Sequence, residues 1–252
     1  MALIYGLKKF LRSLISYFYH WVGFIIGETR AKEIKFLILR VIKGFRPRNT
    51  IRADVLRLAR RVETGERLKL HFGADTRILK GWVNIDITPY REPREYSFPD
   101  LPELRGSRED FFQIDFREGS LPLPDSSVEL IFHEDFIEHL TQKETVLFLA
   151  ETWRILKVGG AHRINTPNLI GSMKRHSNFR NGLSGVYVSE WERYGHENIL
   201  TPSYLKELAE IVGYREVLFT GKNKSRFAGM PEEFRPSEER EDPEQIFCDL
   251  IK

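Results

Sequence analysis

Apolar residues in the first part of the chain recur at steps of three and four residues. The longest such stripe spans residues 4–26 and places its apolar side chains on one face of an α-helix. Similar spacing predicts a second helix over residues 31–43 and a third over residues 50–62, before Gly65 breaks the pattern. The hydrophobic pattern therefore predicts a helical extension over residues 1–63.

Beyond residue 63 the period changes, and short apolar runs typical of β-strands alternate with helical segments. This alternation is typical of a mostly parallel sheet with helices on both faces. Two segments rich in proline and charge, residues 88–109 and 221–243, are expected to be loops. The sequence thus predicts an α/β domain over residues 64–252, doubly wound around a seven-stranded sheet. We expect strands over residues 67–72, 82–87, 111–114, 128–133, 161–165, 216–220 and 245–251, and helices over residues 142–156 and 202–212.

The composition adds limits on compartment and on metal binding. Hydrophobic residues make up 41% of the chain and charged residues 30%, which suits a soluble domain with a buried core. The single cysteine, Cys248, excludes an internal disulfide and a zinc site built from cysteines. It also favours a reducing compartment. We therefore expect a cytoplasmic protein without a bound metal.

Charge is unevenly divided along the chain. Residues 1–63 hold 14 Lys and Arg against four Asp and Glu, a net charge of +10, so the remainder carries −7 of the overall +3. Such asymmetry indicates that the N-terminal part meets an anionic surface, either lipid or nucleic acid. The most apolar run, residues 14–27, is shorter than the ~20 residues of a membrane span and contains His20, so no transmembrane helix is expected.

An apolar stripe beside Lys and Arg suits a helix that lies on an anionic membrane. The same pattern fits helices that cover the catalytic domain as a lid, or that form a homodimer interface. We expect residues 1–45 to mediate membrane or partner contact, with the protein peripheral at a membrane.

Candidate ligand-binding residues follow the first two predicted strands. In an open α/β sheet, ligands bind beyond the carboxyl ends of the strands. The first strand runs into Gly73, Ala74 and Asp75, and a glycine there allows the backbone to approach a ligand closely. The second ends in Asp86 and Ile87, where a carboxylate can accept hydrogen bonds from a ribose diol. Both NAD and S-adenosylmethionine present such a diol.

The third predicted strand is followed by Asp115 and Phe116. Asp115 could accept a hydrogen bond from an adenine amino group while Phe116 covers the ring; a surface turn is the other interpretation. A dehydrogenase is disfavoured, because the dinucleotide motif needs Gly-x-Gly-x-x-Gly with an acid about 20 residues onward. Gly73 has no glycine partner, and Asp86 comes too early.

The order of short motifs resembles that of the class I S-adenosylmethionine-dependent methyltransferases of the type 11 kind. Within that group it is most similar to predicted methyltransferases associated with the synthesis of cell-surface polysaccharides. The resemblance covers roughly residues 66–252 and includes a closing strand where the family has its reversed last strand. The motifs are LHFGA (70–74), GWVNIDI (81–87), DF (115–116), LPLPDSS (121–127), EHL (138–140) and RILKVGG (154–160).

The resemblance implies S-adenosylmethionine as the cofactor and an antiparallel last strand in the sheet. It implies that the loop of Gly73 and Ala74 wraps the methionine part, that Asp86 with Ile87 binds the ribose, and that the adenine lies against the third strand's end. It places His133 and Glu134, after the fourth strand, beside cofactor and substrate.

One position departs from the family pattern. Where the family has a second glycine this chain has Asp75, whose charge and side chain could face the cofactor's ammonium group or block the site. This departure leaves open a non-enzymatic alternative, a degenerate methyltransferase fold that serves as a binding or scaffold subunit.

An oxygen acceptor needs a general base, which typically contributes ~10²–10⁴ in rate. We expect His133 to be that base, with His196 as second candidate and Glu134 beside them; each histidine has a structural interpretation as well. Enzymes that methylate base amines carry an Asn/Asp-Pro-Pro-aromatic motif after the fourth strand, which this chain lacks. The net negative charge of residues 64–252 also argues against a nucleic-acid partner. We expect O-methylation of a glycan or glycolipid precursor, with a small-molecule acceptor such as a quinone as the alternative.

Overall fold

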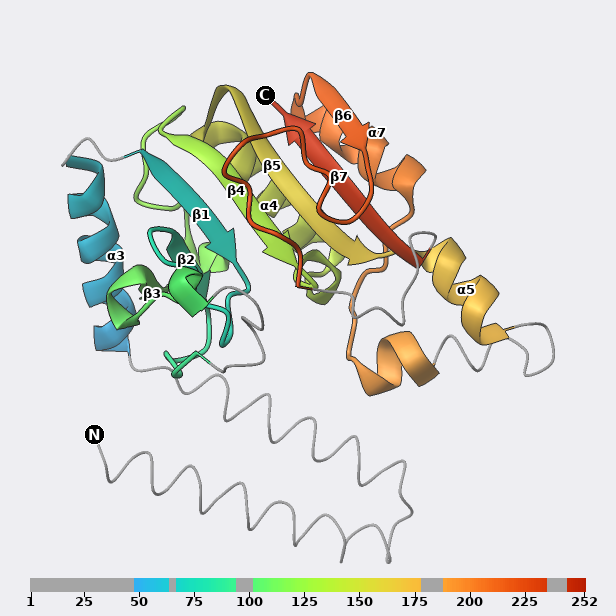
Figure 1. Cartoon of the computed structure of the whole chain (residues 1–252), viewed down its shortest axis with the longest axis horizontal. Helices are drawn as coiled ribbons and strands as arrows, with labels where there is room; N and C mark the ends of the chain where they lie inside the picture. Colours follow the sequence, from blue (N-terminus) through green and yellow to red (C-terminus); the bar gives the residue numbers. More distant parts are fainter. Residues whose placement is uncertain (1–47, 64–66, 94–101, 178–187, 235–243) are drawn as a thin grey trace, which may run out of the picture. The chain divides into compact units, whose positions relative to one another are not determined.

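The computed structural model describes residues 48–63, 67–93, 102–177, 188–234 and 244–252 (Figure 1). The helices predicted over residues 4–26 and 31–43 lie outside these ranges. The described helices and strands are α3 (Arg48–Glu63), β1 (Leu68–Phe72), β2 (Val83–Asp86), β3 (Phe111–Gln113), β4 (Val128–Glu134), α4 (Gln142–Ile155), β5 (Leu156–Pro167), α5 (Leu169–Ser177), α7 (Pro202–Val212), β6 (Glu216–Phe219) and β7 (Gln245–Ile251). Short 3-10 turns cover Pro102–Leu104, Arg108–Asp110, Phe116–Glu118 and Ile137–His139, and a π-helical turn covers Val188–Arg193.

The strands form one seven-stranded sheet in the order β3-β2-β1-β4-β5-β7-β6. Neighbouring strands from β3 to β5 pair in parallel, whereas β7 runs antiparallel to both β5 and β6. This confirms the expected fold class. The strand order reverses between β1 and β4, which is where ligands bind in open sheets of this kind.

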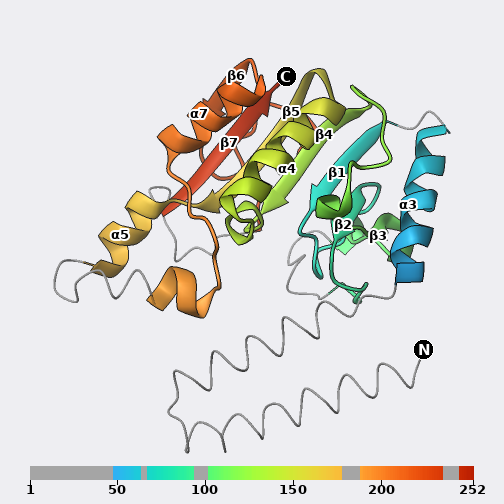
Figure 2. The ribbon, with the colours of Figure 1, turned by 180° about the vertical axis from the view of Figure 1, so that it is seen from behind.

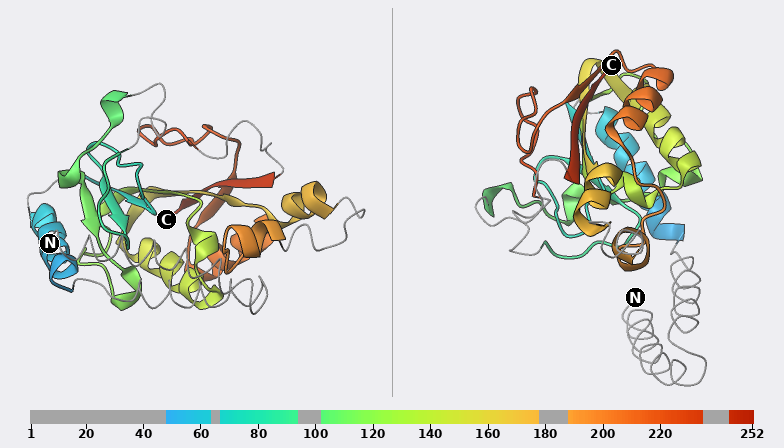
Figure 3. Two further views of the ribbon diagram at one scale, coloured as in Figure 1. Left: turned by 90° about the horizontal axis from the view of Figure 1, so that it is seen from below. Right: turned by 90° about the vertical axis from the view of Figure 1, so that its right-hand side faces the viewer.

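Three helices pack on one face of the sheet, as the views in Figures 2 and 3 show. Leu58 of α3, Phe148 of α4 and Leu205 of α7 are fully buried in the main hydrophobic cluster with the strands. The compact unit spans Asn49–Lys252, so α3, the last helix expected in the extension, belongs to it. Among the described helices, none has the length and apolar character needed to cross a bilayer.

On the opposite face of the sheet, apolar surface is covered by residues 221–234, the covering segment. Residues 74–82 join β1 to β2 without an α-helix, so no crossover helix covers the sheet there. Phe227 and Met230 pack instead against a second cluster that contains Trp82, Leu130 and Phe132. The segment predicted as a solvated loop therefore includes a part that covers apolar surface.

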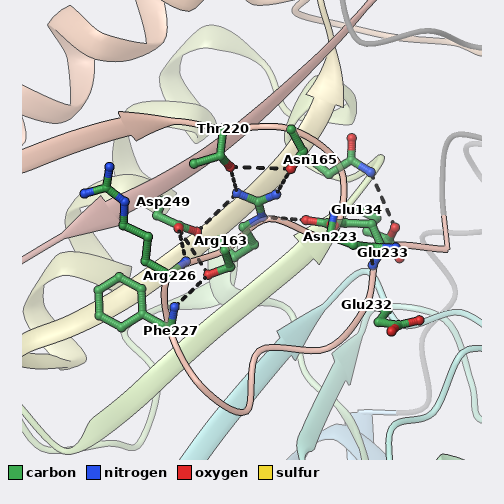
Figure 4. Close-up of polar contacts among 12 residues, drawn as sticks. Glu134, Arg163, Asn165, Thr220, Asn223, Arg226, Phe227, Glu232, Glu233 and Asp249 are labelled. Carbon is green, nitrogen blue, oxygen red and sulfur yellow. Dashed lines mark hydrogen bonds and ion pairs between the residues drawn. The ribbon is translucent and has the colours of Figure 1, made fainter.

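A buried arginine anchors this covering segment (Figure 4). Arg163 of β5 has a fully buried side chain; its Nε bonds Glu233, and its Nη1 lies 3.3 Å from Asp249 Oδ1 of β7. Nη1 also donates to Thr220 Oγ1 at 2.6 Å, and Nη2 donates to the Gly221 carbonyl at 2.9 Å. The carboxylates neutralise a charge that would be costly to bury alone. Glu233 is thereby fixed above the sheet.

Three histidines on the central strands are buried, and burial acts against their charged forms. Burial lowers the pKa of His71 to about 3, with the Arg77 charge contributing and a hydrogen bond to Asn84 opposing. Burial alone lowers the pKa of His162 to about 3. In the unfolded chain both groups bind a proton near pH 6.5. Unfolding therefore takes up protons between pH 6.5 and 3, and stability falls as the pH falls through that window.

We expect His162→Phe to flatten this pH dependence. Each buried neutral histidine costs up to about 1.4 kcal/mol of stability for every pH unit below its unfolded pKa. Urea unfolding of the wild type and the variant between pH 6 and 4.5 should give slopes that differ by nearly that amount, with the variant less sensitive to acid. Equal slopes would show that His162 accepts a proton in the folded protein.

Candidate functional site

Unusual backbone angles gather where β1 and β4 end. Gly73 and Asp75, after β1, have φ angles of +66° and +42°, and Asp135, after β4, has a φ of +44°. Left-handed angles in aspartates are strained and persist where the surrounding structure fixes them, often at functional sites. Because β1 and β4 are parallel neighbours, these residues lie at one edge of the sheet.

Gly73 allows the chain after β4 to pass close to β1. A Cβ atom added there would lie 2.8 Å from Cδ2 of the Phe136 ring, too close for normal contact. Its amide donates to the Ile85 carbonyl at 3.0 Å, which fixes the loop against β2. The glycine is thus required by both the left-handed angle and the packing of Phe136. Ala74 follows with its side chain buried beside Ile78.

We expect Gly73→Ala to weaken both folding and cofactor binding. The left-handed angle alone costs roughly 1–2 kcal/mol in a residue with a Cβ, and displacement of Phe136 adds to it. Gly81→Ala is the matched control, because Gly81 has a φ of +74° and nothing within 4 Å of the added atom. Urea unfolding should show the larger loss for Gly73→Ala, and only this variant should bind S-adenosylmethionine more weakly. Equal behaviour of the two variants would contradict the role of the Phe136 contact.

Asp86 at the end of β2 holds the loop after β1. Its Oδ2 accepts from the Asp75 amide at 2.9 Å, and its Oδ1 accepts from the Thr88 amide at 2.7 Å and hydroxyl at 2.8 Å. A carboxylate has about four lone-pair sites, so one remains for a ribose hydroxyl. Ile87 is exposed beside it, where it can contact an adenosine. Asp86 is therefore fixed in position, and its role toward a ribose stays a prediction.

Asp75 adopts the left-handed backbone conformation that glycine favours. Its φ of +42° is the left-handed conformation, and its amide donates to Asp86. Its carboxylate forms an ion pair with Arg91, and both side chains are about half exposed. The loop is thus held against Asp86, and the aspartate charge is paired with an arginine; contact of the loop with the cofactor stays a prediction.

Asp115 and Phe116 follow β3 as expected, but their side chains have partners within the protein. Asp115 caps the 3-10 turn through the Arg117 amide, and its carboxylate pairs with the Arg117 guanidinium at 2.8 Å and 3.0 Å. The Phe116 ring packs 5.3 Å from the Phe148 ring, measured between centroids. Their roles toward an adenine stay predictions.

His133 points to the helix-covered face of the sheet. Its ring is fully buried, with the rings of Phe136 and Phe148 at 5.5 Å and that of His162 at 5.1 Å between centroids. Neither ring nitrogen has a hydrogen-bond partner among the described residues. Burial lowers the pKa of His133 well below its usual value, and the neighbouring histidines add to this. The ring is therefore neutral, and its role as a base stays a prediction.

Glu134 points to the opposite face of the sheet. Its Oε2 forms an ion pair with Arg77, and its Oε1 accepts from Asn165 Nδ2 at 3.4 Å (Figure 4). Arg77 also donates to the Glu232 carbonyl, so it connects the end of β4 with the segment that covers this face. Sequence reasoning did not find Arg77, because 57 residues separate it from Glu134. A catalytic role of Glu134 stays a prediction.

His196 lies close to Glu190, Glu138 and His139. Its Nδ1 is 3.0 Å from Glu190 Oε2, and its ring centroid is 4.9 Å from that of His139. Glu138 and His139 belong to the 3-10 turn that follows β4, and one potential ligand atom of each lies within 4.8 Å of one from His196. No spacing signal could reveal this group, because His196 is far along the chain from the adjacent Glu138 and His139.

Comparison with known proteins finds similarity to methyltransferases. Residues 83–164 match the family model described as a methyltransferase domain. A stretch of 61 residues is 39% identical to a protein of Mycolicibacterium smegmatis named "Probable S-adenosylmethionine-dependent methyltransferase". That stretch is 23% of this chain and 23% of the relative, so the match spans about a quarter of each.

The chain is also similar to solved structures, at low sequence identity. A methyltransferase from Archaeoglobus fulgidus is 16% identical with a TM-score of 0.47, and the match covers 77% of this chain and 93% of that one. One from Thermotoga maritima is 18% identical with a TM-score of 0.42, covering 79% and 89%. Residues 83–164 are thus similar to a methyltransferase domain, and the mixed sheet with its antiparallel β7 is of the fold class that the resemblance implies.

Proposed function

We propose that this protein transfers the methyl group of S-adenosylmethionine to a hydroxyl oxygen of a glycan or glycolipid precursor. One observation supports the cofactor end most directly. Asp86 at the tip of β2 is hydrogen-bonded to the left-handed loop after Gly73, at the reversal of the strand order. That arrangement is suited to a nucleoside lying across the ends of β1 and β2.

S-adenosylmethionine, when bound, supplies a methyl group on a positively charged sulfur. The loop at residues 73–75 and the carboxylate of Asp86 would hold the nucleoside and methionine parts. Displacement at the methyl carbon is in line, so the protein must align the acceptor oxygen with the carbon–sulfur bond. Residues after β4 are placed for this task, because β4 ends beside β1.

The side chains after β4 support a polar acceptor. Glu138, His139 and His196 offer hydrogen-bonding groups within a few ångströms of one another. Tyr194 stacks on His196 with ring centroids 5.7 Å apart, and 39% of its surface is exposed. An exposed ring with a hydroxyl beside polar groups suits a substrate with apolar sugar faces and many hydroxyls better than an apolar quinone.

A methyl-transfer screen tests this proposal. The full chain is incubated with S-adenosylmethionine labelled in its methyl group and with lipid-linked glycan precursors, a quinone head-group analogue, or no acceptor. We expect the mass of a glycan acceptor to rise by one methyl unit. The added methyl group should survive treatment with alkali, because a methyl ether resists alkali whereas a methyl ester is hydrolysed. Label on the quinone alone would overturn the acceptor class. No binding of S-adenosylmethionine would favour the scaffold alternative.

We also propose that residues 1–45 attach the protein to an anionic membrane. The proposal depends on their net positive charge and apolar stripe, since these residues lie outside the described part of the chain. In the full chain, replacement of Lys8, Lys9 and Arg12 by Glu should reduce flotation with phosphatidylserine vesicles. The same charge change at the exposed Lys143, Lys206 and Lys224 is the control. Unchanged flotation with a changed molecular mass in light scattering would indicate a homodimer interface instead.

A further inference from the structure

We propose that Glu138, His139 and His196 bind one divalent transition-metal ion. One ligand atom from each of the three side chains lies within 4.8 Å of the other two. A bound ion at about 2.0–2.2 Å from each ligand requires these atoms to close in by roughly an ångström. Two imidazoles with one carboxylate are a ligand set used by zinc and by iron, with further positions left open.

The backbone fixes the two parts of this site against each other. The amides of Glu197 and Asn198 donate to the Glu138 carbonyl at 2.8 Å and 3.0 Å. The amide of His196 donates to the Glu190 carbonyl at 3.1 Å. The turn after β4 and the turn that carries His196 are thus joined by main-chain hydrogen bonds. This leaves only side-chain rotation for the ligands to close around an ion.

The buried ligands have the outer partners that metal ligands typically have. Thr166 Oγ1 donates to Glu138 Oε2 at 2.9 Å, which orients the carboxylate. His196 Nδ1 lies 3.0 Å from Glu190 Oε2, and Ser172 donates to the other oxygen of Glu190. A carboxylate close to Nδ1 favours a proton on that nitrogen, which leaves Nε2 as the ligand atom for the ion.

The site is closed on one side and open on the other. Glu138 and His196 are buried, whereas His139 is exposed, so an ion there would keep positions for water or substrate. A dication bound by one carboxylate and two neutral imidazoles forms a site with a net charge of +1. That charge favours an oxygen that is becoming negative.

The role of the ion, unlike its binding, depends on the proposed function. As the acceptor hydroxyl releases its proton to solvent, its oxygen bonds to the methyl carbon and the carbon–sulfur bond breaks, leaving S-adenosylhomocysteine. A dication beside the oxygen would lower the pKa of that hydroxyl. With the ion bound, His196 is a ligand and does not itself take the proton.

Titration of the full chain with metal ions tests the site. The chain is stripped with a chelator and titrated separately with Zn²⁺ and Mn²⁺ by calorimetry, and with Co²⁺ by visible absorption. We expect one equivalent of at least one of these ions to bind, with Co²⁺ giving bands typical of nitrogen and oxygen ligands. Glu138→Gln and His139→Gln should each weaken binding at least tenfold. Glu197→Gln, an exposed neighbour, should leave binding unchanged.

The outcomes separate this proposal from the proposed function. Absence of binding, or equal binding by the wild type and Glu138→Gln, would overturn the site whatever methyl transfer is found. Binding that Glu138→Gln and His139→Gln abolish would support the site even if no acceptor is methylated. Methyl transfer that is unaffected by removal of the ion would overturn the role of the ion. His139→Gln keeps the test informative if Glu138→Gln unfolds, because His139 is exposed.

Discussion

Replacement of Asp86 by Ala is expected to weaken the binding of S-adenosylmethionine at least a hundredfold, about 2.7 kcal/mol. The carboxylate would be lost as an acceptor for the ribose, and the Asp75 and Thr88 amides would lose the group that orders the loop. A charged acceptor is worth more than a neutral one and is costly to remove from fixed donors. Calorimetric titration of the wild type and the variant measures the change.

Asp75→Asn is the matched control for this experiment. Asparagine tolerates the left-handed angle as aspartate does, and the substitution removes only an exposed ion pair with Arg91. Binding should therefore change less than about threefold, within the ~0–1 kcal/mol of a surface pair. If Asp75→Asn weakens binding as much as Asp86→Ala does, the Asp75 charge itself contacts the cofactor, and our account of the loop is wrong.

Arg163→Met is expected to lower the free energy of unfolding by roughly 3–5 kcal/mol, as removal of one partner from a buried ion pair does. The carboxylates of Glu233 and Asp249 would remain buried near each other without their cation. The covering segment would also lose its main anchor on β5. Urea unfolding at pH 7.5 gives the change.

Arg215→Met is the control for Arg163→Met. Arg215 pairs with Glu216 at 3.3 Å, but both side chains are exposed, and such pairs are worth ~0–1 kcal/mol. A loss below about 1 kcal/mol for Arg163→Met would place it in the same class as this surface pair. The Arg163 cluster would then contribute little to holding the segment over the sheet.

Some elements could be predicted almost to the residue because their ends carry local signals. The bounds of α7 agree with the prediction: Thr201 caps its first turn, Pro202 starts it, and Gly213 ends it with a φ of +119°. The strand β7 also has the expected bounds, and the burial of all its residues reflects its position between β5 and β6. Both depend on short-range sequence and on burial, which a single sequence reveals.

Other elements depend on long-range contacts and were missed. The helix α5 and the π-helical turn at Val188–Arg193 were not predicted, although the side chain of Asn168 accepts from the Ile170 amide at the start of α5. The strand β5 begins at Leu156, directly after α4, because its first residues pair with β4 through a register shift. Pairing with a partner strand is not visible in the local pattern.

The candidate site likewise contains residues that the sequence could predict and contacts that it could not. Gly73, Asp75 and Asp86 could be proposed from their places at strand ends, and the structure brings them together through one hydrogen bond and two left-handed angles. The arginine partners of Asp115 and Glu134 were not foreseen. Strand alternation directs His133 and Glu134 to opposite faces, but the sequence does not say which face meets the substrate.

Hydrogen exchange of the wild-type chain with and without S-adenosylhomocysteine tests the central claim most directly, because it reports where the nucleoside binds. We predict slower exchange at the amides of residues 73–76 and 86–88, with no comparable change in α7 or β6. Saturating ligand that leaves both segments unprotected, or protects another part of the chain instead, would contradict the assignment of the strand ends as the cofactor site.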